Sequence, residues 1–331
     1  MNRPAFALAL ILLLPCSAAA TTTGLLKDVV FSHDSELASS GELARRLLSP
    51  FEAMRVQAHG ENKQTLSLKQ ERFAMYVPAK EPPNGYALLV FIPPWDQAEV
   101  PPRWVGVLER RGIILVTAAH SGNDASAFDR RAALAVLAAT NVMALYHVDP
   151  QRAYVTGFSG GSRMAMRVAL GYPDLFRGAL LDAGSDAIGD AIPPPPKPLL
   201  EQFQASSRLV YLTGEQDRFH LDMDSESRHS LPEWCITDIA TVTMPWLGHE
   251  LAEPPTLEHA LVVLEQHHPQ APDKLKACRS RLAQALNAQL DQAQQWMQNG
   301  KTEQALRLLR HIDTHYGGLA APRSVELATQ H

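Results

Sequence analysis

One serine stands between glycines in the segment GFSGG at residues 157–161, where two sequence patterns meet. Residues 153–156 before it predict a strand, and the apolar spacing of residues 164–170 after it predicts a helix. A serine on a sharp strand-to-helix turn points its hydroxyl away from the sheet, and flanking glycines let neighbouring backbone pass. The helix N-terminus also stabilises negative charge beside the hydroxyl. The G-x-S-x-G pattern therefore predicts a nucleophile at Ser159, against the alternative of a glycine-rich turn without chemistry.

A serine hydroxyl is a poor nucleophile until a base removes its proton, and a third group must orient that base. In chains with this kind of turn, the acid and then the histidine follow the serine. Asp217 lies in the loop after a predicted strand at 208–213, and His249 lies in the loop after the last predicted strand at 240–244. We therefore expect Ser159, Asp217 and His249 to be the catalytic residues.

Other residues of the same types lie near these positions. His220 is close to Asp217 in the sequence, and we interpret it as a neighbour of the site and not as its base. His249 has the alternative of a surface histidine bonded to Glu250. The remaining alternatives are the acids Asp182, Glu215 and Asp222 and the histidines His120 and His259.

The negative charge that develops during acyl transfer needs N–H donors, which form an oxyanion hole. One donor is expected from Gly160 and the second from the loop after the predicted strand 86–92. That loop begins with Pro93-Pro94, and because proline has no N–H the second donor would be Trp95. The candidate residues of the substrate cleft are Asn123, Asp124, Phe158 and Trp95, with turn formation and packing as the alternative roles.

The elements that must position these side chains alternate between strands and helices. Such alternation implies a mostly parallel sheet with right-handed crossovers, in which ligands bind beyond the carboxyl ends of the strands. The predicted catalytic residues all follow directly after apolar strands, which agrees with that arrangement. Strands are predicted at 64–77, 86–92, 112–118, 153–156, 178–183, 208–213 and 240–244, and helices at 105–111 and 127–146.

The first twenty residues have the pattern of a secretory signal peptide. Arg3 supplies the positive start, an apolar run follows at 5–14, and small residues at 18–20 fit a cleavage site. The run is too short to span a bilayer, and no later segment is long and apolar enough. Cys16 leaves a lipid anchor as an alternative, but Pro15 before it is a poor fit. The mature chain is therefore expected to be periplasmic or secreted.

Composition excludes several classes of protein. The formal net charge is −5, with acidic and basic residues intermixed, so no nucleic-acid-binding surface is expected. Histidines and cysteines form no cluster with metal-ligand spacing, so neither a metal nor a cofactor is expected. Cys235 and Cys278 are predicted either to form a disulfide or to be two buried thiols, and the sequence favours neither.

Four regions are expected along the chain: a signal peptide at 1–20, an N-terminal segment at 21–63, the main domain at 64–270 and a helical hairpin at 271–331. The hairpin resembles a single tetratricopeptide repeat, and because one hairpin cannot bury its own apolar face, it is expected to pack on the main domain. A protein partner for this hairpin is the alternative. The four prolines at 193–196 predict either a rim of the substrate cleft or an ordinary surface connection.

The chain resembles secreted α/β hydrolases of the polyhydroxybutyrate-depolymerase and feruloyl-esterase type over roughly residues 65–260. The matching stretches are RFAMYVP at 72–78, YALLVFI at 86–92, residues 152–163 and YPDLF at 172–176. The resemblance implies the α/β-hydrolase fold and hydrolysis of a small or oligomeric ester through an acyl-enzyme. It also implies triad roles for Ser159, Asp217 and His249. Pro93-Pro94 departs from the His-Gly that many such hydrolases carry.

Two other functions fit the same residues. A peptidase or amidase of this fold would use the same nucleophile, although no propeller domain of the large oligopeptidase type is evident. A catalytically weak protein of this fold that binds a ligand or partner is the second alternative, supported by the proline-containing oxyanion loop.

Overall fold

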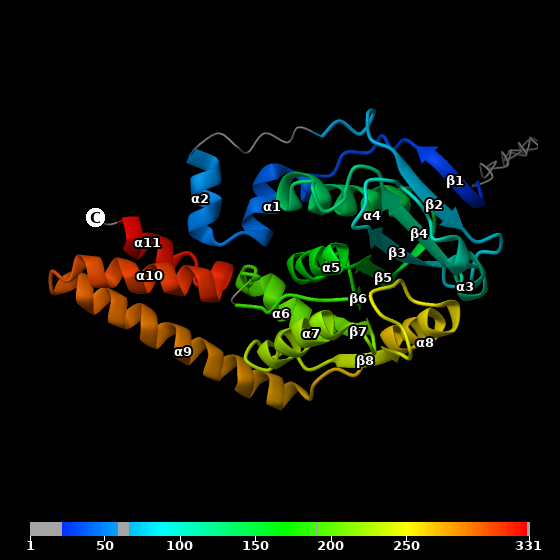
Figure 1. Cartoon of the computed structure of the whole chain (residues 1–331). Helices are drawn as coiled ribbons and strands as arrows, with labels where there is room; N and C mark the ends of the chain where they lie inside the picture. The colour runs from blue at the N-terminus through cyan, green and yellow to red at the C-terminus, as the bar shows by residue number, and fades with distance from the viewer. Residues whose placement is uncertain (1–21, 59–65, 190, 330–331) are drawn as a thin grey trace, which may run out of the picture.

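In the computed structural model, which describes residues 22–58, 66–189 and 191–329, eight strands form one sheet (Figure 1). Their order is β1-β2-β4-β3-β5-β6-β7-β8. β1 and β2 are antiparallel to their neighbours, and the other strands run parallel. The strands are β1 (Gly24–Val29), β2 (Phe73–Val77), β3 (Tyr86–Ile92), β4 (Ile113–Ala118), β5 (Val148–Phe158), β6 (Gly178–Asp182), β7 (Arg208–Gly214) and β8 (Ile239–Met244). The predicted signal peptide lies outside the described residues.

Helices cover both faces of the sheet. α4 and α5 pack on one face, and α3 and α8 pack on the other (Figure 1). Every side chain of β3 and β4 is buried, which explains why these strands read as continuous apolar runs. The α-helices that precede the C-terminal region are α1 (Ser40–Leu47), α2 (Pro50–Ala58), α3 (Val105–Arg111), α4 (Ala133–Leu145), α5 (Gly160–Gly171), α6 (Lys197–Ser206), α7 (Arg218–Ser230) and α8 (Pro254–Glu265).

Most predicted elements agree with this fold, and three differ in extent. The strand predicted at 153–156 is part of the longer β5. The strand predicted at 64–77 is wrong in length, because the chain turns at Ser67, whose carbonyl accepts the Gln70 N–H, and β2 begins only at Phe73. The helix predicted at 127–146 begins with a π-helical stretch, Ala127–Ala132, and continues as α4.

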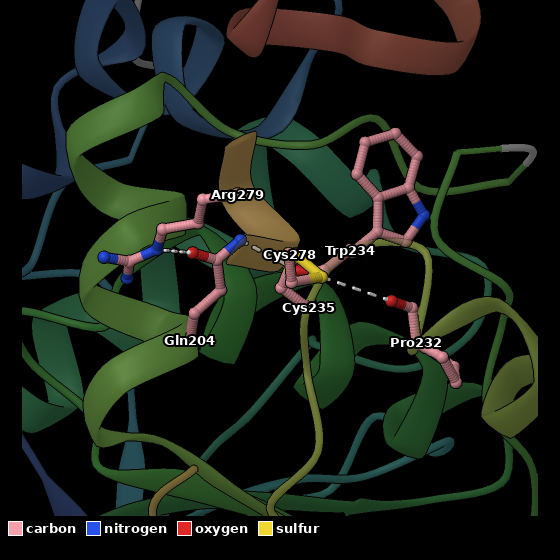
Figure 2. The surroundings of a disulfide bond; sticks show 6 residues. All are labelled: Gln204, Pro232, Trp234, Cys235, Cys278 and Arg279. Atoms are coloured by element: carbon pink, nitrogen blue, oxygen red, sulfur yellow. Dashed lines mark hydrogen bonds between the residues drawn. A yellow bond between two sulfur atoms is a disulfide. The ribbon is translucent and has the colours of Figure 1, made fainter. Parts of the chain in front are cut away.

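The C-terminal helices α9 (Pro272–Gln298), α10 (Thr302–Tyr316) and α11 (Arg323–Thr329) form an arm beside the sheet (Figure 1). A disulfide joins Cys278 of this arm to Cys235, so of the two predicted alternatives the disulfide is the one formed (Figure 2). Beside it, the Gln204 side chain donates to the Trp234 carbonyl at 2.8 Å and accepts from Arg279 Nε at 2.5 Å. The arm is therefore fixed to α6 and to the loop after α7.

Two further contacts fix the far end of the arm. Asp313 Oδ1 accepts the Phe51 N–H at 3.0 Å, which joins α10 to α2. Gly318 N–H donates to the Pro194 carbonyl at 2.8 Å, and a Cβ on Gly318 would lie 2.7 Å from Pro196 N. The four prolines thus serve as a surface against which the C-terminal chain packs. No helix in the described ranges is long and apolar enough to span a membrane.

Candidate active site

Ser159 lies at the turn between β5 and α5 in a strained backbone conformation, with φ 55° and ψ −123°. The turn is tight enough to exclude side chains at the flanking glycines. A Cβ on Gly157 would lie 2.2 Å from the Gly161 carbonyl oxygen, and one on Gly161 would lie 1.9 Å from the Ile92 carbonyl oxygen. Ser159 N–H donates to the Asp182 carbonyl at 2.9 Å, which fixes the turn to β6. The predicted strand-turn-helix geometry is present at this serine.

Asp217 is the N-cap of α7, and this residue is 8% exposed. His249 Nδ1 lies 2.7 Å from Asp217 Oδ2. Burial raises the pKa of Asp217, but hydrogen bonds from His220 and His249 outweigh burial and hold this pKa below its ordinary value. The carboxylate is therefore ionised at neutral pH and accepts the Nδ1 proton of His249. Nε2 of His249 is then left with a free lone pair, as a general base requires.

The two loops that carry these residues are bonded to each other. Glu215 N–H donates to the Met244 carbonyl at 3.0 Å, and Gln216 N–H donates to the Leu247 carbonyl at 2.9 Å. Gly214 has no room for a side chain, because a Cβ would lie 2.1 Å from the Gly248 carbonyl oxygen. The loop after β7 and the loop after β8 therefore hold Asp217 and His249 together.

The alternative acids have other roles. Asp182 is buried, and its Oδ2 accepts the Ala252 N–H at 3.2 Å. Burial raises the pKa of Asp182 well above its ordinary value, since desolvation outweighs the hydrogen bond from Ala252. Glu215 Oε2 accepts the Trp246 N–H at 3.3 Å, and Asp222 is exposed on α7. Within the described residues, none of these three carboxyls bonds a histidine.

Of the alternative histidines, His220 alone hydrogen-bonds Asp217 within the described residues. His120 N–H donates to the Asp96 carbonyl at 2.6 Å, and His259 lies on α8. His220 Nδ1 lies 2.8 Å and 2.9 Å from the two oxygens of Asp217. The sequence analysis placed His220 near the site but missed this shared carboxylate. The spacing of three residues from a helix N-cap was the available signal, because that spacing brings the two side chains together on the first turn.

Aromatic rings pack beside the His249 imidazole. Phe158, next to Ser159, stacks on His249 with ring centroids 4.7 Å apart, and the Trp95 ring centroid lies 6.4 Å from that of Phe158. Phe158 therefore contacts the imidazole of His249, and its role in a substrate cleft stays a prediction. Asp124 is exposed in the loop after β4. No hydrogen bond joins the Ser159 hydroxyl to another group in the part of the chain that the structure describes.

A buried arginine fixes the loop that contains Pro93-Pro94. Arg131 is 6% exposed, and its guanidinium donates to the Ser121 carbonyl at 2.8 Å and to the Pro93 carbonyl at 3.1 Å. Burial lowers the pKa of Arg131 to about 10, which leaves the side chain charged at neutral pH. Since proline still offers a carbonyl, this cation holds the loop through acceptor groups alone. The sequence analysis missed Arg131, because nothing in its local pattern separates it from a helix-surface arginine.

The carbonyls of the same loop point toward the segment after β4. Asn123 N–H donates to the Pro94 carbonyl at 3.0 Å. Among the described residues, Trp95 N–H donates to no other protein group, so it stays available as the expected second oxyanion donor. The Asn123 side chain lies against the turn, because a Cβ on Gly160 would lie 2.1 Å from Asn123 Oδ1. Asn123 therefore lies beside the turn that carries Ser159.

This contact predicts the effect of a side chain at residue 160. In Gly160→Ala the new methyl must displace the Asn123 amide, and we expect kcat for an ester substrate to fall about 100-fold. Removing the obstacle in Gly160→Ala/Asn123→Ala should restore kcat to within about tenfold of Asn123→Ala alone. The matched control is Gly161→Ala, whose methyl meets the Ile92 backbone carbonyl instead. Steady-state kinetics would contradict this geometry if Asn123→Ala rescued kcat equally in Gly160→Ala and in Gly161→Ala.

One group of three side chains in the described ranges could hold a metal ion: Asp217, His220 and His249, whose ligand atoms lie within 4.8 Å of one another. The two imidazole planes, however, are stacked at 12° with centroids 4.2 Å apart. One ion cannot lie in both planes and along both Nδ1 lone pairs without rotation of a ring. The group fits a hydrogen-bonded carboxylate better than a metal centre.

Comparison with known proteins gives no close relative. No family model matches the sequence, and no curated protein matches it. Similar solved structures include the S-formylglutathione hydrolase FrmB of Staphylococcus aureus (9% identity over 59% of this chain and 93% of that chain, TM-score 0.47). Others are an acetyl xylan esterase of Aspergillus awamori (13%, 59% and 94%, 0.44) and dipeptidyl peptidase 4 of Porphyromonas gingivalis (14%, 63% and 33%, 0.43). The chain thus spans one third of that peptidase.

These TM-scores all lie below 0.5, so we define the fold class from the strand order and the turn at Ser159 instead. The sheet has one antiparallel edge, six parallel strands and a serine turn after β5, with polar loops after β7 and β8. This is the α/β-hydrolase fold, and the predicted fold class is confirmed.

Proposed function

We propose that the protein is a serine hydrolase that cleaves carboxylic esters through an acyl-enzyme. The observation that carries this proposal is the hydrogen bond of 2.7 Å between Asp217 and His249. The two loops that hold these residues are hydrogen-bonded to each other, at the edge of the sheet where Ser159 also lies. An imidazole oriented by an ionised carboxylate is the base that a serine nucleophile requires.

In the proposed reaction, His249 Nε2 takes the proton of the Ser159 hydroxyl as its oxygen attacks the ester carbonyl. The carbonyl oxygen becomes negatively charged, and the N–H groups of Gly160 and Trp95 stabilise it. The first-turn N–H of a helix has no intrahelical partner, which leaves that of Gly160 available. His249 then donates its proton to the leaving alkoxide, and an activated water hydrolyses the acyl-enzyme.

The proposal of an ester substrate is based on the motif resemblance, because apolar groups near the base suit esters and amides alike. Phe158 stacks on His249 and Trp95 lies beside Phe158, and such aromatic rings suit an apolar acyl or alkyl group. Membership of the polyhydroxybutyrate-depolymerase and feruloyl-esterase group, suggested by the motifs at 72–78 and 172–176, is part of this proposal. Export is supported by the Cys235–Cys278 disulfide, because disulfides persist in oxidising compartments. The boundaries of the main domain at 64–270 and of the helical hairpin at 271–331 remain part of the proposal.

Active-site labelling tests this function directly. We expect a fluorophosphonate probe to react with the purified mature protein and mass spectrometry to place the adduct on Ser159. Labelling should be lost in Ser159→Ala and kept in Ser162→Ala, which removes a buried hydroxyl on α5, the helix that follows Ser159. Short p-nitrophenyl esters and the matching p-nitroanilides, assayed in parallel, separate an esterase from an amidase. A folded protein that neither labels nor cleaves would overturn the proposal and favour a binding function.

A further inference from the structure

The carboxylate of Asp217 accepts hydrogen bonds from two imidazoles. His249 approaches Oδ2 at 2.7 Å, and His220 approaches Oδ1 at 2.9 Å and Oδ2 at 2.8 Å. An ionised carboxylate has no proton to donate, so each Nδ1 must carry one. Both rings are therefore held in the same tautomer, with the hydrogen on Nδ1 and the lone pair on Nε2.

The two rings also lie face to face. Their centroids are 4.2 Å apart and their planes differ by 12°, while Phe158 covers the other face of His249 at 4.7 Å. The His249 ring is thus held between one aromatic ring that adjoins the nucleophile and one imidazole bonded to the same acid. Its rotation out of this plane would break both stacking contacts.

The two histidines differ in how firmly the chain holds them. His249 lies in the loop after β8, and its side chain is 39% exposed. His220 lies on the first turn of α7, the helix that Asp217 caps, and its side chain is 15% exposed. A space is kept for it as well, because a Cβ on Gly184 would lie 2.6 Å from His220 Cδ2. The helix-borne ring is therefore the fixed one, against which the loop-borne ring is placed.

We propose that His220 is a positioning residue, which holds the His249 imidazole in the plane and tautomer needed to deprotonate Ser159. This inference rests on the proposed function. His220 acts through its Nδ1–H, which fixes the orientation of the Asp217 carboxylate and, through it, the hydrogen bond to His249. The stacked ring is a packing contact, and His220 needs no contact with the substrate.

Two substitutions separate the hydrogen bond from the ring. His220→Asn keeps an N–H close to the place of Nδ1, and His220→Phe keeps a flat ring without that donor. We expect His220→Phe to lower kcat about ten- to a hundredfold with KM little changed, because a misplaced base slows proton transfer without weakening substrate binding. His220→Asn should recover kcat to within about threefold of the wild type. The matched control is His229→Phe on the exposed side of the same helix, which should leave kcat unchanged.

Nitrogen NMR of histidine-labelled protein gives the second readout. The wild type and His220→Asn should show His249 with a protonated Nδ1 and an unprotonated Nε2, whereas His220→Phe should show a mixture of tautomers. Fluorophosphonate labelling of the wild type is run alongside. Labelling in the wild type with unchanged kcat and tautomer in His220→Phe would overturn the role of His220 and leave the esterase proposal standing.

Two other outcomes also decide the matter. Equal losses of kcat in His220→Asn and His220→Phe, with the His249 tautomer unchanged, would assign His220 to packing against Gly184 and overturn the inference. Absence of labelling in the folded wild type would instead remove the proposed function. The tautomer of His249 in the His220 variants would then still show whether His220 positions that ring.

Discussion

Replacing Asp217 by asparagine is expected to lower kcat for ester hydrolysis by about 10⁴-fold, with little change in KM. The expected loss follows from hydrogen-bond chemistry. Asp217 accepts from two Nδ1–H groups, whereas an amide offers one acceptor oxygen and one NH₂ donor. At least one imidazole must then change tautomer and place its hydrogen on Nε2. If that ring is His249, the lone pair that would deprotonate Ser159 is lost.

The control for this variant is Asp182→Asn. Asp182 is an alternative acid, but its carboxyl is buried, its pKa is raised well above the ordinary value, and its Oδ2 accepts the Ala252 N–H. A neutral carboxyl is closely matched by an amide, so kcat should stay within about tenfold of the wild type. Stopped-assay kinetics on both variants distinguish the acids. A greater loss in Asp182→Asn than in Asp217→Asn would reverse the assignment.

The fold was accessible to sequence analysis because parallel strands buried on both faces leave continuous apolar runs. Tyr86–Ile92 and Arg208–Gly214 are such runs, and the polar residues that follow them lie at one edge of the sheet. The turn at Ser159 was accessible for a different reason. Backbone atoms approach its glycines too closely for any side chain to fit, so the sequence must have glycine at these positions.

The features that were missed depend on contacts between distant segments. His220 and His249 are both visible as histidines, but their stacking depends on the loop after β8 folding over the start of α7. Arg131 lies near Pro93 only because the loops after β3 and β4 are neighbours. For the same reason the pairing of Cys235 with Cys278 was left open, since it depends on where α9 packs. Local sequence patterns do not show which distant segments will lie next to each other in the fold.

The four prolines at 193–196 illustrate the limit of composition. Their stiffness was recognised, and the sequence allowed either a rim of the cleft or a surface connection. The structure has Gly317 and Gly318 packed against them, at distances that a Cβ on either glycine would make too short. Two glycines and four prolines, more than a hundred residues apart, therefore form one complementary contact. Stiff backbone on one side and bare backbone on the other permit that close approach.

The largest effect expected on stability comes from Asp224, a buried carboxyl on α7. It is 1% exposed, its Oδ2 accepts from Thr213 Oγ1 at 2.5 Å, and its Oδ1 has no partner in the described part of the chain. Burial raises the pKa of Asp224 from 3.8 to about 7. The folded protein therefore holds a proton that the unfolded chain releases between these values. This contribution is fully present below pH 3.8 and is lost as pH rises through 7, a span of about 4 kcal/mol.

Asp224→Asn removes this titration and should change how stability depends on pH. Between pH 5 and pH 8 the free energy of unfolding of the wild type should fall by about 2.5 kcal/mol relative to the variant, measured by urea denaturation. The free-energy change that the amide itself causes does not depend on pH, so it cancels in the comparison between the two pH values. Asp222→Asn, an exposed position on the same helix, should follow the wild type at both pH values. Parallel behaviour of all three proteins would mean that Asp224 is ionised in the folded state, and that the space around its unpartnered oxygen admits water.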